Sequence, residues 1–233
     1  MNTLLKPHYR SDIDGLRALA VLAVLAFHAY PALLPGGFIG VDIFFVVSGF
    51  LITRLLLENL QQENFSFRSF YVARVLRLFP SLILVLLTCL IFGWMALLSD
   101  EFKALGKHLA ATALFIPNLI FWSESGYFDY AADTKQLLHL WSLGIEEQFY
   151  LVWPLLVWFG FKRKTSIAGL GILLFLVSFA LNTVLVEEAA AASFFSPLTR
   201  MWELLAGCAL ACIVGPDARQ DADNIAATRP LRW

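Results

Sequence analysis

The chain has 233 residues, of which 59% are hydrophobic and 15% are charged, and its formal net charge at pH 7 is −1. Ordinary soluble domains carry roughly 25% charged residues, so this chain has too little polar surface to cover a water-soluble globule. The nearly balanced charge gives no indication of nucleic-acid binding, and the composition favours an all-α, polytopic membrane protein.

Long apolar runs recur along the chain and predict six or seven membrane-embedded helices. A helix needs about 20 apolar residues to cross the hydrocarbon core, and most of the runs are long enough. The run at 105–122 contains Lys107, His108 and Pro117, so it is interpreted either as a full span or as a re-entrant or interfacial helix. The runs lie at about 16–34, 38–57, 78–98, 105–122, 139–160, 166–186 and 198–214.

Basic residues in short segments predict how these helices are oriented. They gather in the N-terminal arm, in 54–77 and in the sequence KRK at 162–164. The positive-inside rule places all three segments in the cytoplasm, which makes 31–37 an external turn. The three cysteines lie in apolar runs and are interpreted as packing residues, so neither a disulfide nor a metal site is predicted.

The first apolar run is bracketed by two ionisable residues, Arg17 and His28. Their spacing of eleven residues is about three helical turns, so both side chains lie on one face, about 16 Å apart along the axis. Asp14 precedes Arg17 by three residues and can pair with it. An arginine can hold an anionic ligand and a neutral imidazole can act as a general base, so a joint role is predicted. Taken singly, Arg17 is equally an interfacial anchor and His28 a packing residue.

Polar residues near the next two runs extend the pattern. Asp42 and Ser48 interrupt the second run, and Asp42 is interpreted either as a group that orients His28 or as a residue of the external headgroup region. Arg74 and Arg77 are three residues apart and lie near one helical face. They fit either positive-inside anchoring or a clamp for phosphate groups on the cytoplasmic side.

Two adjacent acids, Glu146 and Glu147, lie inside a later apolar run. Such residues are costly in a membrane unless they are hydrated, paired or protonated. The spacing of His139, Glu146 and Tyr150 predicts that all three share one helical face. Glu146 and Glu147 are interpreted either as structural partners of cations on other helices or as part of a functional site.

The last apolar run opens with Arg200 and Glu203, three residues apart. They can pair with each other, and the equal alternative is that they pair with Glu146 or Glu147. His8 and His108 have no polar residues at supporting spacings, so both are interpreted as surface residues.

Five motifs in fixed order closely resemble the membrane-bound acyltransferase family 3, and within it the O-antigen O-acetyltransferase branch of bacterial inner-membrane proteins. The resemblance covers about residues 9–212. It rests on DIDGLRALAVLAVLAFH, PGGFIGVDIFFVVSGFLIT, FYVARVLRLFP, HLWSLGIEEQFYLVWPLL and SPLTRMWELLAG. It implies transfer of an acyl group, usually acetyl, from cytoplasmic acetyl-CoA to a hydroxyl of an extracytoplasmic glycan such as lipopolysaccharide O-antigen.

The same resemblance implies roles for individual residues. His28 is the expected catalytic residue, as a general base or through an acyl-histidine intermediate, and acyl-CoA is expected to bind at Arg17, Arg74 and Arg77. Acyl-CoA, the glycan and membrane lipid are the expected partners, and no permanently bound cofactor, metal or nucleic acid is expected. The expected supporting polar residues are Asp14, Asp42, Ser48, His139, Glu146, Glu147, Arg200 and Glu203.

The chain departs from the family in length, since members usually have further spans. We therefore expect 1–214 to form an incomplete transmembrane domain and 215–233 to form a polar C-terminal tail. The expected location is the bacterial inner membrane, with the N-terminus in the cytoplasm. Two alternatives to an active enzyme are a truncated, non-catalytic remnant and a proton-coupled transporter, because intramembrane Arg, His and Glu also serve proton relays.

Overall fold

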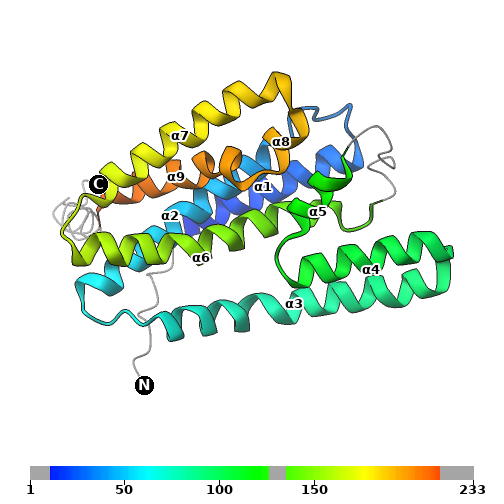
Figure 1. Ribbon diagram of the computed structural model, residues 1–233, viewed down its shortest axis with the longest axis horizontal. Helices are drawn as coiled ribbons and strands as arrows, with labels where there is room; N and C mark the ends of the chain where they lie inside the picture. Colours follow the sequence, from blue (N-terminus) through cyan, green and yellow to red (C-terminus); the bar gives the residue numbers. More distant parts are fainter. Residues whose placement is uncertain (1–10, 126–134, 216–233) are drawn as a thin grey trace, which may run out of the picture. The chain divides into compact units, whose positions relative to one another are not determined.

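The computed structural model describes residues 11–125 and 135–215, and this part of the chain is all-α, as predicted. His8 and the predicted tail, apart from Gly215, lie outside the described residues. Figure 1 shows the helices in chain order. They are α1 (Ser11–Ala29), α2 (Ile39–Gln61), α3 (Phe67–Ala96), α4 (Ser99–Ala113), α5 (Pro117–Glu124), the 3-10 helix η2 (Leu138–Leu140), α6 (Trp141–Lys162), α7 (Ile167–Glu188), α8 (Ala190–Phe195) and α9 (Pro197–Val214).

The described residues form two compact units, and each is described by itself below. Unit 1 comprises those in Phe65–Trp153 and Leu176–Trp202. Unit 2 comprises those in Leu5–Asn64, Pro154–Phe175 and Glu203–Trp233. The division falls within α6, α7 and α9, so each of these helices contributes to both units.

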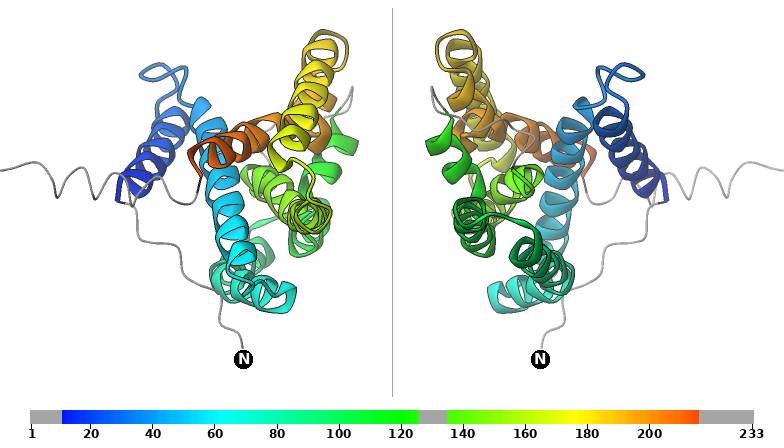
Figure 2. Two further views of the ribbon diagram at one scale, coloured as in Figure 1. Left: turned by 90° about the vertical axis from the view of Figure 1, so that its left-hand side faces the viewer. Right: turned by 90° about the vertical axis from the view of Figure 1, so that its right-hand side faces the viewer.

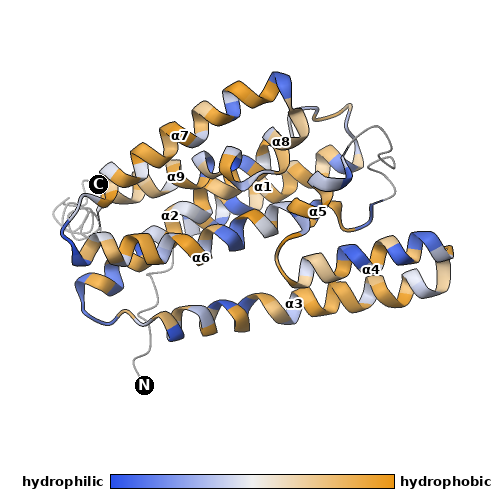
Figure 3. Cartoon of the chain, in the orientation of Figure 1, coloured by the Kyte–Doolittle hydropathy of each residue, from blue (hydrophilic) through white to orange (hydrophobic). Residues whose placement is uncertain are grey.

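Four segments of the described chain are long and apolar enough to cross a membrane. Hydrophobic residues cover most of the length of α3 and α7, as Figure 3 shows. By length and composition the structure therefore agrees with a polytopic membrane protein. The six or seven embedded helices predicted from the sequence also include α1 and α6, which carry ionisable residues within their apolar runs. The four segments are Ile39–Gln61, Phe67–Ala96, Ile167–Glu188 and Ala190–Val214.

The third helix begins much earlier than the apolar run that predicted it. α3 starts at Phe67, because the hydroxyl of Ser66 accepts a hydrogen bond from the Ser69 backbone N–H and caps the helix. Arg74 and Arg77 therefore lie on a helix, which their predicted shared helical face requires, although the apolar run begins only at about residue 78. α3 and α4 run side by side in Figure 1, and a Cβ on Gly93 would lie 2.4 Å from the Leu105 side chain.

The apolar run at 105–122 is broken into two helices. α4 ends at Ala113 and α5 begins at Pro117, which occupies a first-turn position where its missing N–H costs nothing. Between them Phe115 adopts φ of +56°, a left-handed conformation that costs a bulky residue about 1–3 kcal/mol. The surrounding contacts must therefore hold this turn in place.

Unit 2 is built on close contacts between small residues. α1 and α2 are neighbours in both views of Figure 2, and a Cβ on Gly40 would lie 2.3 Å from the Ala20 carbonyl oxygen. On another side of α2, a Cβ on Gly49 would lie 1.9 Å from the carbonyl oxygen of Leu204 in α9. The contact is reciprocal, since a Cβ on Gly207 would lie 1.9 Å from the Val46 carbonyl oxygen. Helices that approach this closely gain packing that larger residues would prevent.

We expect Gly207→Ala to destabilise the protein by at least about 2 kcal/mol, because the backbone atoms it meets cannot move aside as a side chain can. Gly15→Ala is the matched control, since a Cβ at Gly15 has nothing within 4 Å. It should leave stability unchanged or raise it by up to about 1 kcal/mol through better helix propensity. Tryptophan fluorescence during thermal unfolding in detergent measures both, and equal melting temperatures would contradict the packing described.

Candidate functional site

Arg17 and His28 lie on one uninterrupted helix, α1, which confirms the helix on which their predicted shared face depends. Arg17 is half-buried, and its guanidinium carbon lies 5.1 Å from the centre of the Phe44 ring of α2. Its predicted pairing with Asp14 is confirmed at 3.8 Å. This pair is partly exposed and long, so it contributes little to stability. Arg17 is thus placed mainly by packing against α2.

The imidazole of His28 is exposed and held by its own helix. Its Nδ1 lies 2.8 Å from the Val24 carbonyl oxygen, one turn earlier, and its ring meets Phe27 edge-on. A carbonyl oxygen can only accept a hydrogen bond, so Nδ1 must carry the hydrogen. In the neutral ring the lone pair is therefore on Nε2, which is the atom that can accept a proton from another molecule.

The two polar residues of α2, Asp42 and Ser48, differ in their surroundings. Asp42 is half-buried in the first turn, where the helix dipole favours a carboxylate, and Ser48 is buried. Both interpretations of Asp42 stay predictions; what the structure shows is that the Nδ1 atom of His28 is bonded to the Val24 carbonyl oxygen. The sequence could not show this, since a side chain bonded to its own backbone leaves no pattern.

A cluster on α3 and α6 brings together the predicted arginine and acidic motifs within unit 1. Arg74 donates a hydrogen bond of 2.9 Å to Glu147 and lies 3.4 Å from the centre of the Tyr150 ring. The side chains of Arg74 and Glu147 are only 21% and 14% exposed. One turn away, the Tyr71 hydroxyl donates to the Leu151 carbonyl oxygen at 3.0 Å. Glu147 therefore neutralises Arg74. Arg77, one turn further along α3, is exposed.

Of the predicted shared face of His139, Glu146 and Tyr150, the structure shows the contact between Glu146 and Tyr150. The Tyr150 hydroxyl donates a short hydrogen bond to Glu146 one turn earlier on α6. His139, however, lies on η2, ahead of the first residue of α6 at Trp141, and it is exposed. A 3-10 helix has 3.0 residues per turn, so the short η2 segment changes the expected direction of the His139 side chain by only about 40°, and its place on this face stays a prediction.

Two amides that the sequence analysis did not single out complete the surroundings of α6. The Gln148 side-chain amide donates to the Phe115 carbonyl oxygen at 2.8 Å and to the Asn118 side-chain oxygen at 2.9 Å. Asn118 in turn donates to the Phe195 carbonyl oxygen at 3.0 Å. A Cβ on Gly144 would lie 2.8 Å from the same Asn118 oxygen, so glycine is needed for this approach. These bonds hold the left-handed turn between α4 and α5.

Arg200 and Glu203 lie on α9 in different surroundings. The guanidinium carbon of Arg200 lies 5.5 Å from the Trp141 ring centre and 5.9 Å from that of Phe194, a cation–π arrangement. Glu203 is 1% exposed. The sequence analysis offered an acid of α6 as another partner for Arg200. Of those acids, Glu147 forms its ion pair with Arg74.

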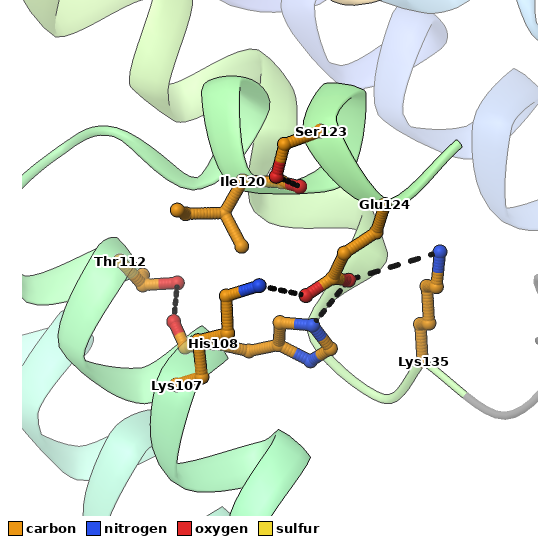
Figure 4. Close-up of polar contacts among 7 residues, drawn as sticks. All are labelled: Lys107, His108, Thr112, Ile120, Ser123, Glu124 and Lys135. Atoms are coloured by element: carbon orange, nitrogen blue, oxygen red, sulfur yellow. Dashed lines mark hydrogen bonds and ion pairs between the residues drawn. The ribbon is translucent and has the colours of Figure 1, made fainter. Parts of the chain in front are cut away.

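Around Glu124 three basic side chains meet, and the sequence analysis missed this cluster. Lys107 donates to one carboxylate oxygen at 2.7 Å and His108 Nε2 to the other at 2.8 Å, with Lys135 3.9 Å away (Figure 4). His108 is 4% exposed, so its interpretation as an unpartnered surface residue is wrong. Residue spacing could not predict this cluster, because the break at Phe115 turns α5 back towards α4.

The cluster changes the acidity of Glu124. Burial raises the pKa of this carboxyl group, but hydrogen bonds from Lys107 and His108 and their charges outweigh burial, so the pKa lies below its ordinary value. Glu124 therefore remains ionised and ties α5 to α4 and to the segment before η2.

Comparison with known proteins shows that the chain belongs to the acyltransferase family indicated by its motifs. The acyltransferase domain family matches residues 10–222. No solved structure matches the chain. The class of protein is thus a membrane acyltransferase domain.

Its relatives are bacterial. The chain is 39% identical to the Bacillus subtilis protein YrhL over 225 residues, covering 93% of this chain and 35% of the relative. It is 38% identical to the peptidoglycan O-acetyltransferase OatA of Listeria monocytogenes (88% and 34% covered) and 36% identical to the O-acetyltransferase OatA of Staphylococcus aureus (94% and 37% covered). The chain therefore spans about a third of the length of these relatives. They do not support the expected O-antigen branch.

We expect Glu124→Gln to lower stability at pH 7 by about 1–2 kcal/mol, because two charged hydrogen bonds are lost from a partly exposed site. Since the folded-state pKa of Glu124 is below the ordinary 4.5, its carboxylate stabilises the fold above pH 4.5, and this contribution is lost as the pH falls through the lowered pKa. The difference between variant and wild type should therefore shrink below pH 4.5.

Thermal unfolding followed by tryptophan fluorescence from pH 3.5 to 7.5 measures this difference. The matched control is Glu188→Gln, an exposed acid at the end of α7. A Glu124→Gln variant as stable as Glu188→Gln at pH 7 would show that the cluster does not hold α4 and α5 together.

Proposed function

We propose that this chain is the acetyl-transferring membrane domain of a cell-wall glycan O-acetyltransferase. The donor is acetyl-CoA from the cytoplasm, and the acceptor is a hydroxyl of an extracytoplasmic glycan. Peptidoglycan is the preferred acceptor, because a relative that is 38% identical is named a peptidoglycan O-acetyltransferase. The observation that carries the proposal is the arrangement of Arg17 and His28 on α1 in a chain of the acyltransferase family.

The proposed reaction uses the free nitrogen of His28. Nε2 accepts the proton of the acceptor hydroxyl, whose oxygen then attacks the carbonyl carbon of the thioester. The carbon–sulfur bond breaks, and the coenzyme A thiolate takes the proton back from the imidazolium ring. The Val24 carbonyl supports this role, since it fixes the tautomer whose Nε2 can act as a base.

The proposed membrane arrangement follows the basic segments. With the N-terminus in the cytoplasm, α1, α2, α3, α6, α7 and the α8–α9 segment would each cross the bacterial inner membrane. The α4–α5 pair would enter from outside and return, which leaves KRK at 162–164 in the cytoplasm, as the positive-inside rule favours. This proposal is supported by the break at Phe115, which stops 105–122 from forming a single helix.

The proposed donor contacts lie at the cytoplasmic ends of two helices. Arg17 on α1 and at least one of the two arginines near the start of α3 each carry a guanidinium group, which is a type of group that suits the phosphates of coenzyme A. Along α1, Arg17 and His28 are about 16 Å apart. An extended pantetheine arm on α1 is long enough to reach from one to the other.

We expect His28→Ala to lower glycan acetylation by at least about 100-fold, the usual lower limit for loss of a general base. The measurement is mass spectrometry of peptidoglycan fragments from cells that carry the gene, lack it or carry the variant, read as the added mass of an acetyl group. His8→Ala serves as the matched control. Wild-type acetylation in cells whose His28→Ala protein is present in the membrane would contradict the proposed role.

A further inference from the structure

Arg74 and Arg77 differ in their surroundings, although they are only three residues apart on α3. Arg74 is paired with Glu147 and lies against the face of the Tyr150 ring. Arg77 is exposed and makes no hydrogen bond or ion pair with any residue that the structure describes. One guanidinium is thus already occupied within the protein, and the other is accessible.

A phosphate could reach Arg74 only at a cost. The guanidinium would have to leave Glu147, and that carboxylate would remain 14% exposed on a largely apolar helix without its cation. The Nε atom of Arg74 is buried as well, so it is not accessible in this arrangement. Binding of a phosphate to Arg77 would neither break an ion pair nor leave a carboxylate without its cation.

The contacts of Arg74 also fix the position of α3 on α6. The pair with Glu147 and the hydrogen bond from Tyr71 to Leu151 join the two helices at points one turn apart. Stacking of the guanidinium on Tyr150 restrains a ring whose hydroxyl holds Glu146. Both contacts therefore set how the next turn of α3, which carries Arg77, is presented.

We propose that Arg77 binds a phosphate of the acyl-CoA donor and that Arg74 is a positioning residue, which acts through Glu147 and Tyr150 and does not touch the donor. This inference rests on the proposed function and assigns different roles to Arg74 and Arg77. It predicts that loss of Arg77 weakens donor binding, whereas loss of Arg74 impairs turnover by a donor that still binds.

The test compares Arg77→Ala, Arg74→Ala and Glu147→Gln in the purified full chain in detergent. Calorimetric titration with coenzyme A, and with pantetheine as a probe that lacks all phosphates, measures binding. Initial rates at varied acetyl-CoA concentration separate KM from kcat. Tryptophan fluorescence confirms that each variant is folded.

Arg77→Ala should weaken coenzyme A binding by about tenfold or more and leave pantetheine binding unchanged. Arg74→Ala and Glu147→Gln should each lower kcat by about tenfold, with coenzyme A affinity within about threefold of wild type. If Arg74→Ala fails to fold, Glu147→Gln tests the same contact. The exchange of charges in Arg74→Glu with Glu147→Arg should recover part of the kcat that either single change loses.

Equal losses of coenzyme A affinity in Arg74→Ala and Arg77→Ala would overturn the division of roles. So would unchanged affinity in Arg77→Ala. A wild-type chain that binds no coenzyme A and transfers no acetyl group would instead contradict the proposed function, and this inference with it.

Discussion

The backbone groups freed where helices end cannot be left unbonded in a membrane, and in unit 1 Gln148 of α6, together with Asn118 of α5, bonds two of them. The side-chain amide of Gln148 donates to the Phe115 carbonyl oxygen in the turn after α4. Through Asn118 the same network reaches the Phe195 carbonyl oxygen at the end of α8. Irregular backbone at membrane depth persists only where protein groups satisfy it in this way. The polar stretch of α6 therefore determines where three other segments can lie.

This constraint connects the fold to the proposed chemistry. Glu147, next to Gln148, binds Arg74 and so sets α3 against the same helix. One short segment of α6 thus fixes both the broken α4–α5 pair and the turn of α3 that carries Arg77. His28 is placed independently in unit 2, by the length of α1 and by the Val24 carbonyl. The proposed donor contact at Arg77 and the proposed base His28 are in this sense supported by separate sets of contacts.

Much of the fold and part of the site could be predicted from residue spacing. The all-α architecture, the helix shared by Arg17 and His28, the Asp14 pair and the bond between Glu146 and Tyr150 each depend on residues a few turns apart on one regular helix. Periodicity is informative there, because the rotation per residue is constant.

The remaining contacts depend on breaks in helices and on contacts between distant helices, which residue periodicity does not predict. His108 meets Glu124 because Phe115 adopts a left-handed conformation, and no glycine or asparagine marks that turn. Arg74 meets Glu147 across 73 residues of chain, so its partner could be proposed but not chosen from the sequence.

The most direct measurement is hydrogen–deuterium exchange of residues 111–119 in wild type and in Gln148→Leu, a substitution that keeps side-chain bulk and removes both amide hydrogen bonds. If α6 holds the broken helix pair, these backbone amides should be protected in the wild type and exchange about ten times faster or more in the variant, while those of α2 do not change. Equal exchange in the two proteins would show that the turn holds itself and that α6 does not organise this unit.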